Sequence, residues 1–155
     1  YETLVGAALR RALRSGEERP VARPIDLHHV LHAGAGKIEF ETFEEGRELE
    51  ILTRLLQRAQ LEVFRSRMVG VNLAPLLARF DDGVVVETSD VMSAGELLGQ
   101  LGRIPGFAQM LSALGVQSES RELAASALEF VLQGLHLSRR LDRELVGGTV
   151  RYSAG

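Results

Sequence analysis

The spacing of apolar residues along the chain predicts a protein built mainly from helices. In several stretches the apolar residues recur every three or four positions, as they do on a helix that buries one face. The longest of these stretches cover residues 42–68 and 118–143, and shorter ones cover residues 2–16, 27–36, 72–81, 93–103 and 105–115. We therefore expect two long helices, and we expect the apolar stripe of the second to organise the core.

Three other stretches have the period of strands. Ile38 and Phe40 alternate with charged residues in "KIEFET", and Val150 and Tyr152 alternate with polar residues near the end of the chain. The third stretch, "VVVET", follows an Asp-Gly turn. The predicted fold class is therefore mainly α: a helical bundle with two long helices and a small two- or three-stranded sheet.

Residues that favour helix ends support these boundaries. Ser93 and Glu96 have the spacing of a capping box, as do the first and last residues of the stretch 42–45. Asp26 and Asn72 are predicted N-caps of the helices that follow them. Glycine and proline predict further boundaries, at Gly16, Gly34, Gly36 and Gly115 for helix C-termini and at Pro105 for a first helical turn.

Composition and charge are those of an ordinary globular domain. The chain has 155 residues, of which 45% are hydrophobic, enough for about one domain with a sizeable core. No uncharged apolar run is long enough to span a membrane, and the formal net charge of −3 implies no general attraction to nucleic acid. The chain lacks cysteine, which excludes disulfides and thiolate catalysis, and it shows no signal segment. Together these features predict a cytoplasmic protein.

The stretch "HAGAGKIEF", residues 32–40, contains two glycines, and the second is followed by lysine, as in a phosphate-binding loop. Such a loop needs G-x-x-x-x-G-K-[ST] between a buried strand and a helix. Here Leu31 stands where the first glycine is required, and Ile38 replaces the hydroxyl that binds Mg²⁺. The predicted order of elements is also reversed. We therefore interpret the stretch as a helix end followed by the entry to a strand.

Three clustered histidines, His28, His29 and His32, are candidate metal ligands. His28 and His32 are four positions apart, which places both on one face of a helix. Two ligands seldom hold an ion, and the sequence shows no evident third ligand nearby. We favour helix histidines without a metal, and a metal-binding protein that uses His28 and His32 remains an alternative.

Acidic residues crowd the region around the start of the predicted helix 42–68. They could raise one another's pKa and form an acid/base pair, or bind a hard cation. Negative charge is also favoured in the first turn of a helix, which is the interpretation we prefer. The residues are Glu39, Glu41, Glu44, Glu45, Glu48 and Glu50.

A basic concentration occupies the first helix and the connector after it. Guanidinium groups bind phosphates and carboxylates well, so a phosphate or an acidic partner is conceivable. No aromatic residues interleave with these arginines, which argues against single-stranded nucleic acid, and we favour a solvated helix face. The residues are Arg10, Arg11, Arg14, Arg19 and Arg23. Because no motif of nucleophilic catalysis is evident, the residues alone predict a helical domain with no catalytic residue and no metal ligand.

Several segments are informative through their order. An arginine-bearing helix is followed by "PIDL", then by "GKIEFE", a long helix, and finally "SALEFVLQGLHLSRRL" with its basic end. Over nearly the whole chain this order resembles the C-terminal part of bacterial AAA+ ATPases of the magnesium-chelatase ATPase-subunit-like, MoxR-related group. The absence of an initiator methionine before Tyr1 also indicates a fragment of a longer chain.

The resemblance implies a lid-type helical segment at residues 1–36 and a C-terminal helical extension with short strands at residues 37–155, which can pack as one domain. In this family the phosphate-binding loop and the arginine finger belong to an upstream core, so ATP and Mg²⁺ are expected there and no cofactor is expected in this chain. The parent protein would be the ATPase. A sensor arginine that contacts the nucleotide would be Arg10, Arg11 or Arg14, or would lie upstream of Tyr1.

The implied partners are the chain's own AAA+ core, neighbouring subunits in a homo-oligomer and an unidentified protein, with neither nucleic acid nor a membrane among them. The implied function is a non-catalytic domain that mediates contacts within and between subunits. The alternative is an independent helical interaction or regulatory domain, whose partner binds an apolar groove between the two long helices.

Overall fold

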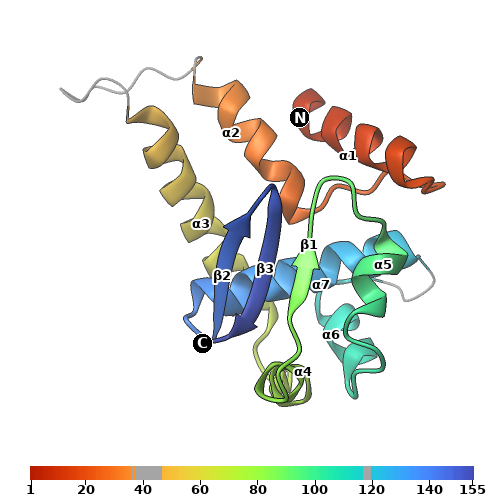
Figure 1. Cartoon of the computed structure of the whole chain (residues 1–155). Helices are drawn as coiled ribbons and strands as arrows, with labels where there is room; N and C mark the ends of the chain where they lie inside the picture. Colours follow the sequence, from red (N-terminus) through yellow and green to blue (C-terminus); the bar gives the residue numbers. More distant parts are fainter. Residues whose placement is uncertain (36, 38–46, 117–119) are drawn as a thin grey trace.

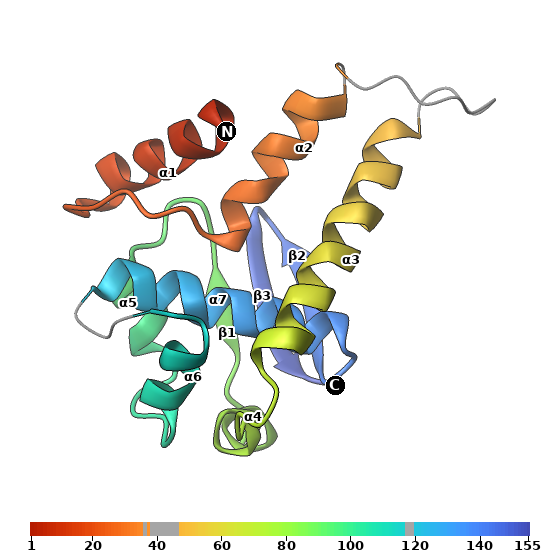
Figure 2. The ribbon, with the colours of Figure 1, turned by 180° about the vertical axis from the view of Figure 1, so that it is seen from behind.

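Helix α7 (Arg121–Leu137) lies in the middle of the fold, and most other elements pack around it (Figure 1). The computed structural model describes residues 1–35, 37, 47–116 and 120–155. Within these ranges, α7 contacts α3 (Glu48–Arg67), α5 (Ala94–Gly99), α6 (Phe107–Ala113) and the 3-10 turn η1 (Pro24–Asp26). The other helices are α1 (Glu2–Ser15), α2 (Leu27–Ala35) and α4 (Ala74–Asp81). Helix α2 lies between α1 and α3 and contacts both, as Figure 2 shows from behind.

Three antiparallel strands form one small sheet beside α7. Their order is β1 (Val86–Thr88), β3 (Thr149–Ala154) and β2 (Leu141–Val146). Tyr152 of the central strand pairs with Val86 on one side and with Arg143 on the other. The predicted class, mainly helical with a small sheet, is confirmed. Most of the predicted strand 37–42 lies outside the described residues, as does the predicted capping box at 42–45.

The end of α7 differs from its predicted position. Apolar spacing extends the helix to Arg143, but it ends at Leu137 and the chain returns as β2. The hydroxyl of Ser138 donates to the carbonyl oxygens of Gly134 and Leu135, and Arg139 has a left-handed φ of 61°. These two local features stop the helix, and Leu141, which continues the helical spacing, is buried in a strand instead.

Two predicted helix boundaries are also wrong. Gly34 lies inside α2 and has no positive φ, so it does not end the helix, while Gly36 lies outside the described residues. Asp26 does not cap α2: it is the last residue of η1, and its carboxylate accepts a hydrogen bond of 2.8 Å from the backbone N–H of Arg23. This hydrogen bond to a residue earlier in the chain fixes the turn that precedes α2.

Other predicted caps agree with the structure. The capping box of Ser93 and Glu96 is present in full at the start of α5. Gly16 ends α1 with a left-handed φ of 69°. The side chain of Asn72 accepts a hydrogen bond from the N–H of Ala74, although the N-cap position of α4 is one residue later. Helix α6 begins at Phe107, two residues after Pro105, and Gly115 follows it with a φ of 73°.

The core forms mainly where α7 meets the other helices and the sheet. Apolar side chains from α3, α4, α5, α6 and all three strands converge on α7 in one cluster. The residues of α7 with no exposed surface are Ala125, Leu128, Val131, Leu132 and Leu135. Most residues of α7 are buried, which agrees with the expectation that this helix organises the core.

Gly134 allows α3 to approach α7 closely. A Cβ atom at Gly134 would lie 2.1 Å from Cδ2 and 2.3 Å from Cγ of the buried Phe64 ring. We expect Gly134→Ala to destabilise the protein by about 1 to 3 kcal/mol, because the ring and helix must move apart. Gly95→Ala is the matched control, since Gly95 is also helical and has open space around it. Chemical denaturation of both variants measures the difference, and equal stabilities would contradict this close packing.

Candidate functional site

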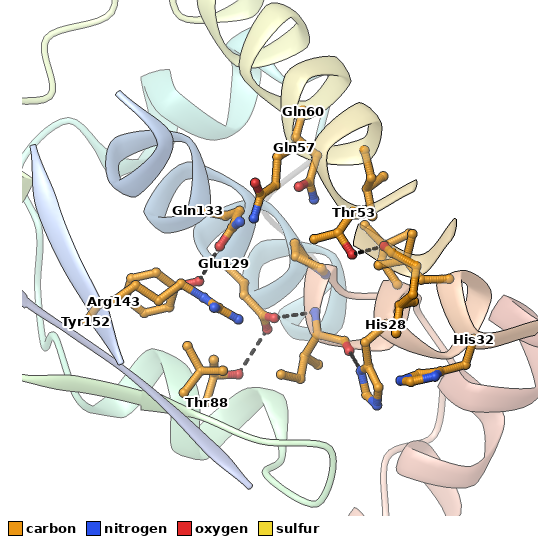
Figure 3. A pocket seen from close by; sticks show the side chains of 17 residues that line it. His28, His32, Thr53, Gln57, Gln60, Thr88, Glu129, Gln133, Arg143 and Tyr152 are labelled. Atoms are coloured by element: carbon orange, nitrogen blue, oxygen red, sulfur yellow. Dashed lines mark hydrogen bonds between the residues drawn. The ribbon is translucent and has the colours of Figure 1, made fainter. Parts of the chain in front are cut away.

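A cavity of about 260 Å³ lies between α2, α3, α7 and the sheet (Figure 3). Apolar side chains of α2 and the first half of α3 form one part of its wall. Polar side chains of α2, α3, α7, β1, β2 and β3 also line the cavity, together with apolar residues of η1 and β3. The polar and charged lining residues are His28, His32, Thr53, Gln57, Gln60, Thr88, Glu129, Gln133, Arg143 and Tyr152.

The floor of the cavity contains a buried carboxylate, Glu129. One oxygen accepts a hydrogen bond of 2.7 Å from Nε of Arg23 and another of 3.1 Å from the hydroxyl of Thr88. The second oxygen accepts one of 2.6 Å from the backbone N–H of Ile25. Both Arg23 and Glu129 are nearly completely buried. Three donors satisfy this carboxylate. Glu129 therefore holds the segment from Arg23 to Ile25, and β1, against α7.

Arg23 occupies the centre of this arrangement. Besides Glu129, its guanidinium donates to the carbonyl oxygen of Met92 at 2.7 Å and to the hydroxyl of Thr88. The sequence-based interpretation of Arg23 as solvated is therefore wrong. Polar partners that are distant in the sequence compensate its buried charge, and no local pattern indicates them.

Arg11 is the second correction among the basic residues. It is buried on the same side of α1 as Ala8 and Ala12, and its guanidinium donates to Glu17 at 2.9 Å and to Asp26 at 3.1 Å. Glu17 in turn accepts a hydrogen bond of 2.6 Å from the backbone N–H of Ala94. Arg10, Arg14 and Arg19 are exposed, as predicted. The network of Arg11, Glu17, Asp26, Arg23 and Glu129 thus joins α1 to α5 and α7.

Tyr152 and Gln133 form a neutral pair at the cavity. The tyrosine hydroxyl donates a hydrogen bond of 3.0 Å to the carboxamide oxygen of Gln133. Burial raises the pKa of Tyr152 well above its ordinary value, and the nearby negative charge of Glu129 raises it further. The hydroxyl therefore stays protonated at physiological pH, which fixes it as the donor and Gln133 as the acceptor.

Sequence reasoning missed the glutamines of this site. Gln57 and Gln60 are three residues apart on the side of α3 that faces the cavity, near Thr53. Gln133 and Glu129 are four residues apart on α7, inside the apolar run "ALEFVLQGL". Polar residues at helical spacing within an apolar run are the signal that could have identified them, because buried polar groups require partners.

The structure places two of the three candidate histidines at the cavity. His28 and His32 line it, and Nδ1 of His28 contacts the carbonyl oxygen of Ile25. His29 does not line it, and its pKa is lowered by burial and by the neighbouring His28. Within the described ranges, no group of three or more His, Cys, Asp or Glu side chains is arranged to hold a metal ion.

We expect zinc to bind weakly to this chain, because two histidines on one helix leave most of the coordination sphere to water. Titration with zinc, followed by calorimetry, measures the affinity and the stoichiometry. Matched variants are His28→Ala, His32→Ala and His136→Ala, the last of which lies outside the cavity. A stoichiometric site that is lost in the first two variants but not in the third would contradict this expectation.

The remaining candidates that the structure describes do not line the cavity. Glu50 pairs with Arg47 and Arg54 on the exposed side of α3, and the hydrogen bond from Arg47 lowers its pKa. Glu48 is also in the first turn of α3, and neither residue lines the cavity. Glu39, Glu41, Glu44 and Glu45 lie outside the described residues. Lys37 follows α2 in an exposed turn, so a helix precedes it, as predicted.

Comparisons with known proteins add no family to this picture. The chain matches no protein-family model, no curated protein and no solved structure. Among the described helices, none combines the length and the apolar character needed to cross a membrane. The interpretation of the site therefore depends on its own residues.

Proposed function

We propose that this chain is the non-catalytic C-terminal lid and extension domain of a magnesium-chelatase-like, MoxR-related AAA+ ATPase. It packs against the ATPase core through its first segment, residues 1–36, and the extension at 37–155 contains the two long helices, α3 and α7. It transmits nucleotide-dependent movements and contacts neighbouring subunits of a cytoplasmic homo-oligomer. ATP and Mg²⁺ bind to the core. The order of segments in the sequence supports the family, and the exposed side of α1 supports the role.

The exposed side of α1 is the observation that carries this proposal. Val5, Leu9 and Leu13 are spaced four residues apart and are 44%, 46% and 75% exposed. Tyr1 extends the same row, which we call the α1 stripe (Tyr1, Val5, Leu9 and Leu13). The opposite side of α1 is already packed in this chain, with Ala8 and other residues buried. A contiguous exposed apolar row is typical of a surface that binds another protein surface.

The attachment of α1 supports a role in transmitting movement. Arg11 links the buried side of α1 to Glu17 and Asp26 through buried ion pairs. The next ion pair, between Arg23 and Glu129, links the same segment to α7. Because the pairs are buried and form several hydrogen bonds, they hold α1 in one orientation. If a partner displaced α1, the movement would therefore be transmitted to α7.

Two observations test this proposal. The coding sequence upstream of Tyr1 should contain a phosphate-binding loop. In the parent protein, Leu9→Glu with Leu13→Glu should abolish nucleotide-dependent assembly and reduce ATP hydrolysis, while the 155-residue chain keeps its melting temperature. Leu145→Glu on β2, where the leucine is 68% exposed, is the matched control. An upstream region without such a loop, or unchanged assembly of the double variant, would overturn the proposal.

The chain alone is expected to bind no nucleotide tightly. No described segment provides a strand, a glycine loop and a helix in the order that a phosphate site requires. Calorimetry with ATP and Mg²⁺ should therefore show no heat of binding. Micromolar binding that disappears in Lys37→Ala would show instead that residues 32–40 hold a phosphate.

A second candidate function is an independent helical interaction or regulatory domain. An apolar groove of about 290 Å³ favours it, although this groove lies between α1, the connector and α7 rather than between α3 and α7. Its lining includes Leu4, Leu27, Leu123 and Phe130. Leu123→Glu, at a residue that is 40% exposed, would abolish partner binding if this function holds, whereas the α1 stripe variant would not.

A further inference from the structure

The cavity beside α7 contains hydrogen-bonding groups that other described residues leave unused. The carboxamides of Gln57 and Gln60 form no hydrogen bond with a described residue. Gln133 is 8% exposed, and its oxygen is occupied by Tyr152, so its NH₂ group is left to the cavity. Figure 3 shows the side chains of Gln57 and Gln60 directed toward Gln133. Three carboxamides from two helices therefore converge on one space.

Arg143 adds a positive charge to this space. It lines the cavity from β2, and it lies beside Tyr152, its partner across the sheet. In Figure 3 its guanidinium points toward Glu129, but that carboxylate already accepts hydrogen bonds from three donors. Arg143 forms no ion pair with a carboxylate of the described ranges. Its charge is therefore available to an anion that enters the cavity.

Part of the cavity lining is apolar. Leu31, Leu49 and Leu56 contribute to it from α2 and α3, beside the polar side chains of His28, His32 and Thr53. The volume of about 260 Å³ is just below the range of about 300 to 1,000 Å³ that is typical of sites for drug-sized ligands. An amino-acid derivative is of suitable size. The site therefore fits a small ligand with one charged end, one amide-like group and one apolar part.

We propose that this cavity binds a small carboxylate that also carries an amide group and an apolar body. The carboxylate pairs with the guanidinium of Arg143, whose planar fork matches its two oxygens. The amide group bonds to the carboxamides of Gln57, Gln60 and Gln133, which offer both donors and acceptors. The apolar body packs against the leucines. A free N-acylated amino acid and the C-terminal residue of a peptide share this chemistry.

The test uses the 155-residue chain and three probes. N-acetyl-leucine carries all three features, N-acetyl-leucine amide lacks the carboxylate, and an acetylated tripeptide ending in leucine represents a peptide C-terminus. Nuclear magnetic resonance of the ¹⁵N-labelled protein follows the side-chain NH₂ signals of the three glutamines during each titration. We expect saturable shifts with N-acetyl-leucine or with the tripeptide, and at least tenfold weaker binding of the amide, about 1.4 kcal/mol. The stronger of the two carboxylate probes identifies the source.

Variants assign the binding to named residues. Arg143→Gln should weaken binding about tenfold or more, whereas Arg140→Gln, outside the cavity, should leave it unchanged. Gln57→Leu should weaken binding several-fold. Because Arg143 is exposed and Gln57 only half-buried, these variants should keep the melting temperature of the unchanged protein. Absence of saturable shifts with both carboxylate probes, equal binding of the amide, or unchanged affinity of Arg143→Gln would each overturn the proposal.

Discussion

Replacing Glu129 by glutamine is expected to lower the free energy of unfolding by about 3 to 5 kcal/mol, because it leaves the guanidinium of Arg23 buried without a counter-charge. The loss includes hydrogen bonds. Glu129 accepts from Arg23, Thr88 and the N–H of Ile25, whereas a carboxamide offers one oxygen and presents its NH₂ group to the remaining donor. Urea denaturation of the 155-residue chain measures the effect.

The matched control for this variant is Glu62→Gln. Glu62 forms an ion pair of 3.2 Å with Arg58 on the exposed side of α3, where the two side chains are 66% and 80% exposed. Water screens such a pair, so its removal is expected to cost about 0.3 to 0.5 kcal/mol. Equal and small losses in both variants would mean that water reaches Arg23 and Glu129, and that the network does not anchor the first 26 residues.

Leu128→Ala is expected to cost about 2 to 5 kcal/mol, through lost transfer free energy and through the cavity that remains. Leu128 has no exposed surface and belongs to the apolar cluster around α7. Arg10→Ala should change stability by less than about 0.5 kcal/mol, because the side chain is on the exposed side of α1. Thermal denaturation of the two variants gives the comparison. A larger loss for Arg10→Ala would show that the exposed side of α1 is packed in solution.

Much of the helical fold can be predicted from this sequence because its signals are local. The spacing of apolar residues identified α1, α3 and α7, and the capping box of Ser93 and Glu96 identified the start of α5. The end of α7 was not predictable in this way. Leu141 fits the helical spacing from Leu137, and it also fits the alternation of a strand, so the apolar pattern permits both.

The candidate site was less predictable than the fold, because its contacts join distant parts of the sequence. Arg11 and Arg23 resemble ordinary surface arginines until their partners are known, and Glu129 and Gln133 are visible only as polar interruptions of an apolar run. The cavity brings together residues of α2, α3, α7 and the sheet, and no single segment contains its pattern. The clustering of its histidines indicates candidate ligands in the sequence, whereas its glutamines do not form one cluster there.

The ion pair between Arg23 and Glu129 also affects the order in which the protein folds. The two residues are 106 positions apart, so the N-terminal segment cannot be fixed in place until α7 has been synthesised and folded. When this segment detaches, its buried charges regain water, which offsets part of the ion-pair energy lost. Opening of the first 26 residues should therefore require less free energy than opening of the core around α7, and the N-terminal segment would act as a separate cooperative unit. We therefore expect α1 to be the last helix to pack during folding and the first to detach during unfolding.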